Sequence, residues 1–318
     1  GSVDVISIKS EENLLRVKPD RGKRRDEKRI WFYFKVNGYD STRLLRLQIE
    51  FAFEDLLNDY IVYSYGQKNW LQLKGKDIGK AREFEIRLNG SDVYFALGYP
   101  YTYSDLIAFI NRVSSSSNCC ISTLTLSEGG LWVPLLKVTD DNNPSGTKPM
   151  IWFIVRQHAF ESPTSFFVEG IIEQLLSPDD DAVSNFRNRF DTYIVPMMDV
   201  DSVKEGNTGK GEAPYDFNRN WPGQSHWNAV KAVKQLISIK SVDQPLKAFI
   251  DCHSPYPISR VGSHYYNHYE TGSPKHGKLT ALYDIYRRRT GLDIGAVNRS
   301  MNGLSARDYI DNNDAEDA

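Results

Sequence analysis

The sequence predicts an α/β protein in two parts: an antiparallel β-sandwich, then an α/β domain with a mostly parallel sheet. Short segments of alternating polar and apolar residues, separated by turns such as Asn37-Gly38, fill the first part. From residue 98 onward, helical patterns alternate with apolar strand patterns, as in a sheet covered by helices. We therefore expect a β-sandwich domain at 1–97 and an α/β domain at 98–318.

The composition is that of a globular protein without an obvious polyanionic or membrane partner. The chain has 318 residues, 40% of them hydrophobic, with a net charge of −2 and a pI of about 6.4. No apolar stretch is long enough to span a bilayer. The three cysteines form neither a disulfide framework nor a CxxC metal motif. We expect neither nucleic acid nor a membrane as a partner.

The strands expected in the sandwich are short and bounded by turn residues. They cover residues 31–36, 45–51, 60–65, 70–73, 84–88 and 93–97. No cluster of titratable residues in this part suggests chemistry. Its expected role is to pack against the second part or to shape access to it.

The second part opens with a helix for which Ser104 is the expected N-cap. An apolar stripe from Leu106 to Val113 gives this helix a buried face. The remaining patterns predict strands near 119–126, 131–138, 150–155, 192–198 and 246–251, and helices after 161, around 226–238 and over 274–290.

The candidate site begins with the uninterrupted apolar run Met150–Val155, the pattern of a strand buried on both faces. His158 and Glu161 follow it, and Ser162-Pro163 then marks the start of a helix. A His and a Glu are thus expected at the carboxyl end of a buried strand, where open α/β sheets place their sites.

His253 follows a second expected strand, Leu246–Asp251. One histidine at a strand end is more often a structural, hydrogen-bonded residue. Two such histidines, one with a Glu three residues on, favour a metal site instead. His158, Glu161 and His253 would form a two-His, one-carboxylate zinc site with an open fourth position for water.

The loop between these strands contains Asp216-Phe-Asn-Arg-Asn-Trp221. Arg219 beside Asn218 suits the binding of a substrate carboxylate, because the guanidinium group donates two parallel hydrogen bonds. In the alternative interpretation, Arg219 pairs with Asp216 and only braces the loop.

These motifs, in the order HxxE, NRNW and a strand ending in His, resemble the M14 zinc carboxypeptidases. The sandwich followed by Tyr99-Pro-Tyr-Thr-Tyr-Ser-Asp-Leu106 resembles the cytosolic carboxypeptidase branch of that family. The resemblance implies an α/β/α carboxypeptidase fold with a mixed, mostly parallel sheet, and a single Zn²⁺ ion. It implies that His158, Glu161 and His253 bind the zinc, and that Asn218 and Arg219 bind the substrate's terminal carboxylate.

The implied reaction is removal of the carboxy-terminal residue of a peptide by metal-activated water. The family's upstream arginine, which stabilises the oxyanion, is absent from Lys204–Gly211. Lys210 is the nearest cation there and is the candidate oxyanion stabiliser, as a point charge without the planar guanidinium group. The family's general base follows a loop that Gly303–Tyr309 resembles, but Ile310–Ala318 has no strand pattern. The general base is therefore unassigned, and we expect the catalytic domain to lack its last strands and helix.

Two other functions stay open: a deacylase or amidohydrolase on the same scaffold, and a zinc-binding pseudo-peptidase. The expected substrate is a peptide or peptide-like molecule with a free carboxylate, and Arg260 is a candidate contact for an acidic terminal residue. The resemblance favours the cytoplasm, whereas a chain that begins with Gly-Ser could equally have lost a signal peptide and be periplasmic or secreted. The oligomeric state is not predicted.

Overall fold

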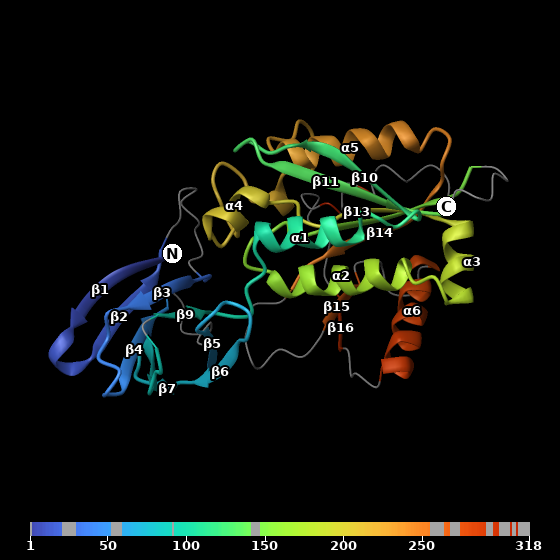
Figure 1. Ribbon diagram of the computed structural model, residues 1–318. Coiled ribbons are helices and arrows are strands. Elements are labelled where there is room, and N and C mark those ends of the chain that lie inside the picture. Colours follow the sequence, from blue (N-terminus) through green and yellow to red (C-terminus); the bar gives the residue numbers. More distant parts are fainter. Residues whose placement is uncertain are drawn as a thin grey trace.

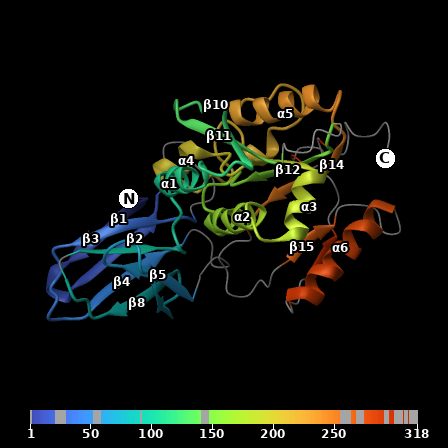
Figure 2. The ribbon, with the colours of Figure 1, turned by 45° about the vertical axis from the view of Figure 1, so that its right-hand side comes forward.

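The computed structural model describes most of the chain as a small β-domain joined to a larger α/β domain (Figures 1 and 2). The residues it describes are 2–20, 30–51, 59–90, 92–140, 147–254, 264–267, 274–290, 295–298, 306 and 310. None of the helices in these ranges is long and apolar enough to cross a membrane.

The β-domain consists of two sheets that pack face to face. The first has the order β1-β2-β4-β8-β7 and the second β3-β9-β5-β6. All strand pairs in them are antiparallel except β2 with β4. The strands are β1 (Val3–Lys9), β2 (Leu14–Pro19), β3 (Tyr33–Asn37), β4 (Leu45–Glu50), β5 (Tyr60–Ser64), β6 (Leu71–Lys74), β7 (Lys76–Asp77), β8 (Ala81–Ile86) and β9 (Asp92–Ala96), with a 3-10 turn at Ser10–Glu12.

Side-chain alternation explains why the β-domain folds as a sandwich. In β4, Leu45, Leu47 and Ile49 are buried, whereas the residues between them are partly exposed. β1 and β2 were not expected from the sequence. β1 is an edge strand whose Val5 and Ile8 are exposed, so its apolar residues do not mark a buried face.

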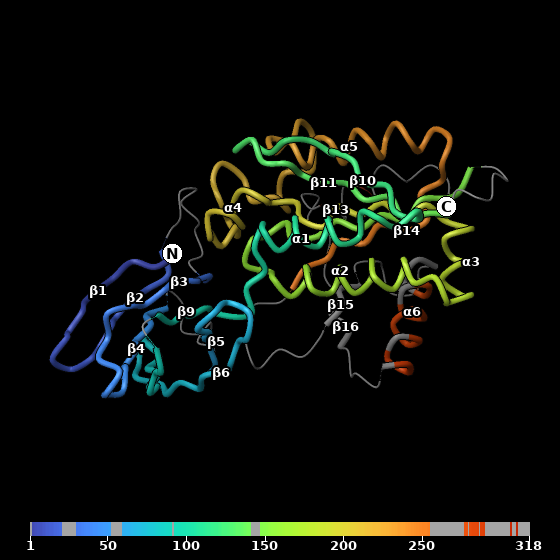
Figure 3. The backbone as a smooth tube through the Cα atoms, viewed as in Figure 1, coloured from blue at the N-terminus to red at the C-terminus, as the bar shows by residue number. Residues whose placement is uncertain are grey.

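The α/β domain follows through residues 97–102, which lead from β9 into α1 (Figure 3). Its elements are α1 (Tyr103–Val113), β10 (Cys119–Leu126), β11 (Trp132–Val138), β12 (Met150–Val155), α2 (Ser162–Leu175), α3 (Asp181–Arg189), β13 (Asp191–Val195), α4 (Val200–Glu205), η3 (Phe217–Arg219), α5 (Asn228–Lys240), β14 (Leu246–Cys252), β15 (His264–Asn267), α6 (Pro274–Thr290) and β16 (Gly295–Asn298). The main sheet has the order β10-β11-β13-β12-β14, and β15 pairs with β16 separately.

The main sheet is mixed, as the family resemblance implied. β11 pairs antiparallel with both β10 and β13. β12 is parallel to both of its neighbours, β13 and β14. α5 covers one face of the sheet, and α1 and α2 lie on the other (Figures 1 and 2). β12 is therefore enclosed on both faces, which explains its uninterrupted apolar sequence.

One local expectation was wrong: α1 is capped by Thr102, not by Ser104. The Thr102 side chain accepts a hydrogen bond from the Asp105 amide, and the Asp105 carboxylate accepts one from the Thr102 amide. This reciprocal pair is a capping box, and it fixes the helix start two residues earlier than expected.

The pairing of β12 with β14 determines where the candidate site lies. Ile154 is opposite Asp251 and Val155 is opposite Cys252, so the two strands end level with each other. The turns that follow them, one carrying His158 and the other His253, therefore start side by side at one edge of the sheet.

Candidate metal site

The structure brings His158, Glu161 and His253 together at the carboxyl ends of β12 and β14. Their nearest side-chain N and O atoms all lie within 4.8 Å of one another. One Glu161 carboxylate oxygen is 2.9 Å from Nδ1 of His158, and the other is 3.0 Å from Nδ1 of His253. His158 and Glu161 are buried, and the His253 side chain is 24% exposed.

These three residues fit a zinc ion in both chemistry and spacing. Two imidazole nitrogens and one carboxylate form a known zinc donor set. Ligand atoms about 2.1 Å from a tetrahedral zinc lie roughly 3.4 Å from each other. The separations of 2.9 and 3.0 Å are close to that value. The partly exposed His253 leaves the cluster open on one side.

The charges of the cluster lower the pKa of Glu161 and raise the pKa of His253. Burial alone raises the pKa of Glu161, but the charges of His253 and His158 outweigh it and lower this pKa to about 2. Burial alone lowers the pKa of His253, but Asp251 and Glu161 together raise it well above 6.5. Glu161 is thus a carboxylate at neutral pH and a suitable ligand for a cation.

Each histidine is held by a carboxylate on its other ring nitrogen. Nε2 of His158 is 3.1 Å from Asp216, and Nε2 of His253 is 3.0 Å from Asp251. A carboxylate bound at Nε2 favours the tautomer whose Nδ1 can bind a metal, and Nδ1 of each ring faces the Glu161 carboxylate. Asp216 and Asp251 therefore orient the candidate ligands.

Both orienting carboxylates are themselves fixed. Asp251 accepts a hydrogen bond of 2.8 Å from the Gln157 amide, whose oxygen accepts one of 2.8 Å from the indole of Trp221. Asp216 accepts the backbone amides of Gly211 and Asn218. Burial raises the pKa of Asp216, but these bonds and the nearby His158 and Lys210 hold it well below its usual range.

Lys210 reaches the site from a glycine-rich loop. Its Nζ lies 3.3 Å from Oδ2 of Asp216 and 3.0 Å from Nε2 of His158. Lys210 is thus on the side of the imidazole that faces away from Glu161. It neutralises the carboxylate that orients His158.

Gly209 explains how the loop can come so close. Its φ is +74°, which only glycine adopts readily. An added Cβ would lie 2.5 Å from the backbone nitrogen of Ala159, on the turn between His158 and Glu161. No side chain fits at position 209 unless that turn moves.

Arg156 supports the same turn from inside the protein. Its backbone has a φ of +59°, and its side chain is buried. The guanidinium group donates to the carbonyl of Ala159 and to the hydroxyl of Ser165 at 3.0 Å. Burial lowers the pKa of Arg156 to about 10, so the group is a cation at neutral pH. It holds the turn at a point between the two candidate ligands.

The Asn218-Arg219 pair lies on η3 beside His253. Nδ2 of Asn218 is 3.0 Å from Nε2 of His253, and its Oδ1 accepts the backbone amide of Ala306 at 3.1 Å. Arg219 is exposed, and its guanidinium group donates to the carbonyl of Asn218 at 2.7 Å. Asp216 pairs with His158 and Lys210, so its observed contacts differ from the loop-bracing Asp216–Arg219 pair considered above.

The structure thus brings together five of the residues named from the sequence: His158, Glu161, His253, Asn218 and Lys210. Arg219 is adjacent to them in the chain, with its side chain turned to solvent. Arg260 and the tail at 311–318, where no general base was found, lie outside the described residues.

Sequence reasoning missed three supporting residues. Asp251 could have been found, since an Asp two residues before a strand-end His is a local signal. Asp216 and Arg156 act through contacts that depend on the folded turn.

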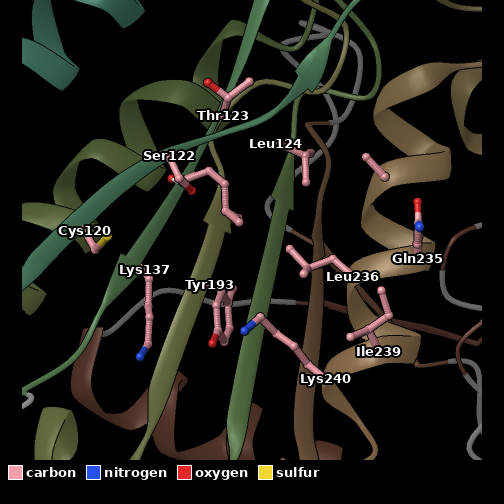
Figure 4. Close-up of a pocket in the computed structure, with 12 residues that line it drawn as sticks. Cys120, Ser122, Thr123, Leu124, Lys137, Tyr193, Gln235, Leu236, Ile239 and Lys240 are labelled. Atoms are coloured by element: carbon pink, nitrogen blue, oxygen red, sulfur yellow. Dashed lines mark hydrogen bonds between the residues drawn. The ribbon is translucent and has the colours of Figure 1, made fainter.

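A separate pocket of about 460 Å³ lies between the β10-β11-β13 side of the sheet and α5 (Figure 4). Its lining includes Lys137, Tyr193 and Lys240, and Tyr193 lies under the ammonium group of Lys240. None of the candidate metal ligands lines it. This hollow is therefore distinct from the candidate metal site.

Comparison with known protein families decides the affiliation of the chain. The sequence profile of the zinc carboxypeptidase family, M14, matches residues 106–290. The chain belongs to this family. The profile of the cytosolic carboxypeptidase N-terminal domain matches residues 1–97. Both the family and the branch resemblance inferred from the sequence are confirmed.

Individual relatives are similar over most of this chain. Cytosolic carboxypeptidase 6 of Caenorhabditis elegans is 29% identical over 266 residues, covering 75% of this chain. The human protein of the same name is 29% identical over 280 residues, covering 80%. This chain spans 56% and 54% of their lengths, respectively, or little more than half of each.

Solved structures confirm the fold class. A metallo-carboxypeptidase from Burkholderia cenocepacia superposes with a TM-score of 0.85 at 23% identity, covering 98% of this chain and 84% of the other. One from Pseudomonas aeruginosa, in complex with (2-guanidinoethylmercapto)succinic acid, gives a TM-score of 0.80 at 23% identity, with the same coverages. The two-part architecture is therefore shared with these structures over 98% of this chain.

Proposed function

We propose that this protein is a zinc-dependent metallocarboxypeptidase that removes the carboxy-terminal residue of peptides. The observation that supports the proposal is the meeting of His158, Glu161 and His253 next to Asn218 and Arg219. A metal donor set thus stands beside two groups suited to a substrate carboxylate. The names of the relatives, cytosolic carboxypeptidases, support a cytosolic location, which we include in the proposal.

Zinc, when bound, would supply a Lewis acid for the scissile carbonyl and an activated water. The chain's own part is to hold both histidine rings with Nδ1 toward one point, through Asp216 and Asp251. Arg219 would bind the terminal carboxylate of the substrate through two parallel hydrogen bonds, with Asn218 as a further donor. The exposure of Arg219 leaves it available for this contact.

We propose two roles for Lys210, and they require its ammonium group in different positions. In its observed position it neutralises Asp216 and so supports the orientation of His158. Stabilisation of an oxyanion, the role proposed from the sequence, requires its ammonium group to leave these contacts and face the substrate. We further propose a domain boundary near residue 97, after β9, with 98–318 forming the catalytic domain.

The test uses the zinc-loaded full chain and peptide pairs that differ only in a free or amidated carboxyl terminus. Mass spectrometry should show loss of the terminal residue from the free form alone. Arg219→Ala should lower kcat/KM about 10- to 100-fold, since a charge-assisted hydrogen bond contributes about 1.5–3 kcal/mol. Arg87→Ala, which removes an exposed arginine in the β-domain, is the matched control.

The outcomes separate the candidate functions. Hydrolysis of acyl-amino acids but not of peptides would replace the peptidase with a deacylase. Zinc binding without any hydrolysis would indicate the pseudo-peptidase. Equal cleavage of free and amidated peptides would remove Arg219 and Asn218 from the proposed carboxylate site.

A further inference from the structure

Phe160 belongs to two parts of the protein at once. In sequence it lies between the candidate ligands His158 and Glu161, and its ring stacks near the His158 ring, with centroids 6.3 Å apart and planes 25° apart. In space its side chain is buried in the hydrophobic core of the β-domain. The other buried members of that core that the structure describes come from residues 17–97. The metal-ligand turn therefore inserts one side chain into a different domain.

Thr208 makes a second connection at the same place. Its hydroxyl oxygen accepts the backbone amides of Ile30 and Trp31, both at 3.1 Å, from the segment that leads into β3. Its backbone carbonyl accepts the amide of Phe160 at 3.0 Å. Thr208 is buried, so these bonds are shielded from water. One residue thus ties the β-domain to the metal-ligand turn.

The two connections converge on the orientation of His158. Thr208 precedes Gly209 and Lys210, whose ammonium group lies 3.0 Å from Nε2 of His158. The Phe160 ring stacks near the same imidazole, with the centroids 6.3 Å apart. The β-domain therefore restrains both the turn that carries His158 and the loop that contacts its outer nitrogen.

We propose that the β-domain is a structural component of the metal site, and that Phe160 and Thr208 are the positioning residues through which it acts. The inference rests on the proposed zinc site. It concerns the preorganisation of the ligands rather than the chemistry, so zinc affinity is the property that should change. A β-domain that only adds stability would leave zinc affinity unaltered.

The first test compares two leucine substitutions in the same hydrophobic core. Phe160→Leu and Phe84→Leu each remove a buried ring from the β-domain core, but Phe84 lies on β8, far along the chain from the ligands. Both should lower the unfolding temperature of the full chain. Phe160→Leu should raise the zinc Kd about tenfold, measured against a competing chelator, whereas Phe84→Leu should change it less than about twofold.

The second test removes one hydroxyl group. Thr208→Val keeps the shape of the side chain but leaves the amides of Ile30 and Trp31 without their acceptor. We expect about a tenfold weaker zinc affinity. Thr208→Ser restores the hydroxyl and should restore the affinity. This pair decides the question if Phe160→Leu does not fold.

The outcomes keep this inference apart from the proposed function. If the unaltered chain binds no zinc, the proposed metal site fails. If it binds zinc, and Phe160→Leu and Thr208→Val bind equally well, the site stands and the role of the β-domain is overturned. A zinc Kd raised equally by Phe84→Leu would also overturn it, because general destabilisation would then be the cause.

Discussion

The two candidate ligand turns reach similar geometry by different means. His253 directly follows β14, and the carboxylate that orients it, Asp251, lies two residues earlier, on that strand. His158 lies in a buried turn, and its orienting carboxylate, Asp216, comes from a loop 58 residues away. The difference shows that one half of the site is fixed by local sequence and the other by tertiary folding.

The two halves also differ in what surrounds them. The His253 side chain is 24% exposed, whereas that of His158 is 3% exposed and is enclosed by the turn, the Lys210 loop and Phe160. A buried group depends more on each hydrogen bond that it makes, because water cannot replace a lost partner. Loss of a hydrogen-bond partner should therefore weaken zinc binding more in the His158 half of the site than in the His253 half.

Removing what the two halves share should have the largest effect. Glu161 contacts Nδ1 of both histidines, so Glu161→Gln removes a ligand and the negative charge between them. We expect the zinc Kd to rise more than about 100-fold, beyond the effect of losing an outer hydrogen bond. Chelator competition measures it. A Kd within tenfold of the unaltered protein would exclude Glu161 as a ligand.

The pair Asp216→Asn and Asp251→Asn tests the comparison directly. Each substitution is nearly isosteric and removes one orienting charge, so zinc affinity should fall about 10- to 100-fold in both. Asp216→Asn should cost more, because it also leaves Lys210 without its counter-charge next to buried His158. Titration of the two variants with zinc under one condition is sufficient. A larger loss from Asp251→Asn would reverse the assignment of the sensitive half.

The smallest expected effect is a change in the number of protons that the protein releases when it binds zinc. Asp251 and Glu161 raise the pKa of His253 well above 6.5 in the zinc-free protein, so this candidate ligand keeps its proton to a higher pH than an ordinary histidine, and zinc must displace that proton. Zinc binding should therefore release about one proton and become tighter as the pH rises. Asp251→Asn removes a charge that raises this pKa, so it should release fewer. Calorimetry in two buffers of different ionisation enthalpy gives the number.

The raised pKa of His253 makes the stability of the zinc-free fold depend on pH in the opposite direction to zinc affinity. A raised His pKa stabilises the folded state fully below the unfolded value, about 6.5, and this contribution is lost as the pH rises through the folded pKa. The zinc-free protein should thus become less stable above neutral pH while its zinc affinity improves. Equal proton release on zinc binding by the unaltered chain and Asp251→Asn would contradict the claim that Asp251 raises the pKa of His253.

The parts of the fold that the sequence predicted are those with a strong local pattern. The apolar run of β12, the stripe of α1 and the alternation in β4 each follow from burial of one or two faces. β1 was missed because it is an edge strand with exposed Val5 and Ile8. The cap of α1 was misplaced because Ser104 and Thr102 are both suitable residues, and the position of Asp105 decides between them.

The residues of the candidate site likewise divide into those with a local sequence pattern, which were predicted, and those whose role depends on the folded turns, which were not. His158, Glu161 and His253 were identified because each follows a recognisable strand. Arg156 was not, because its role depends on a positive φ and on the path of the turn around it. Pairing of Asp216 with His158 was not foreseen either, since two residues in separate loops meet only once both loops have folded.

The absence of a side chain at Gly209 has a consequence for redesign of this protein. The loop passes so close to Ala159 that position 209 cannot carry any residue larger than glycine while the turn keeps its place. A guanidinium group intended to strengthen transition-state binding could not be grafted there without displacing the backbone between two candidate metal ligands. Such a graft would have to come from another element on the open side of His253.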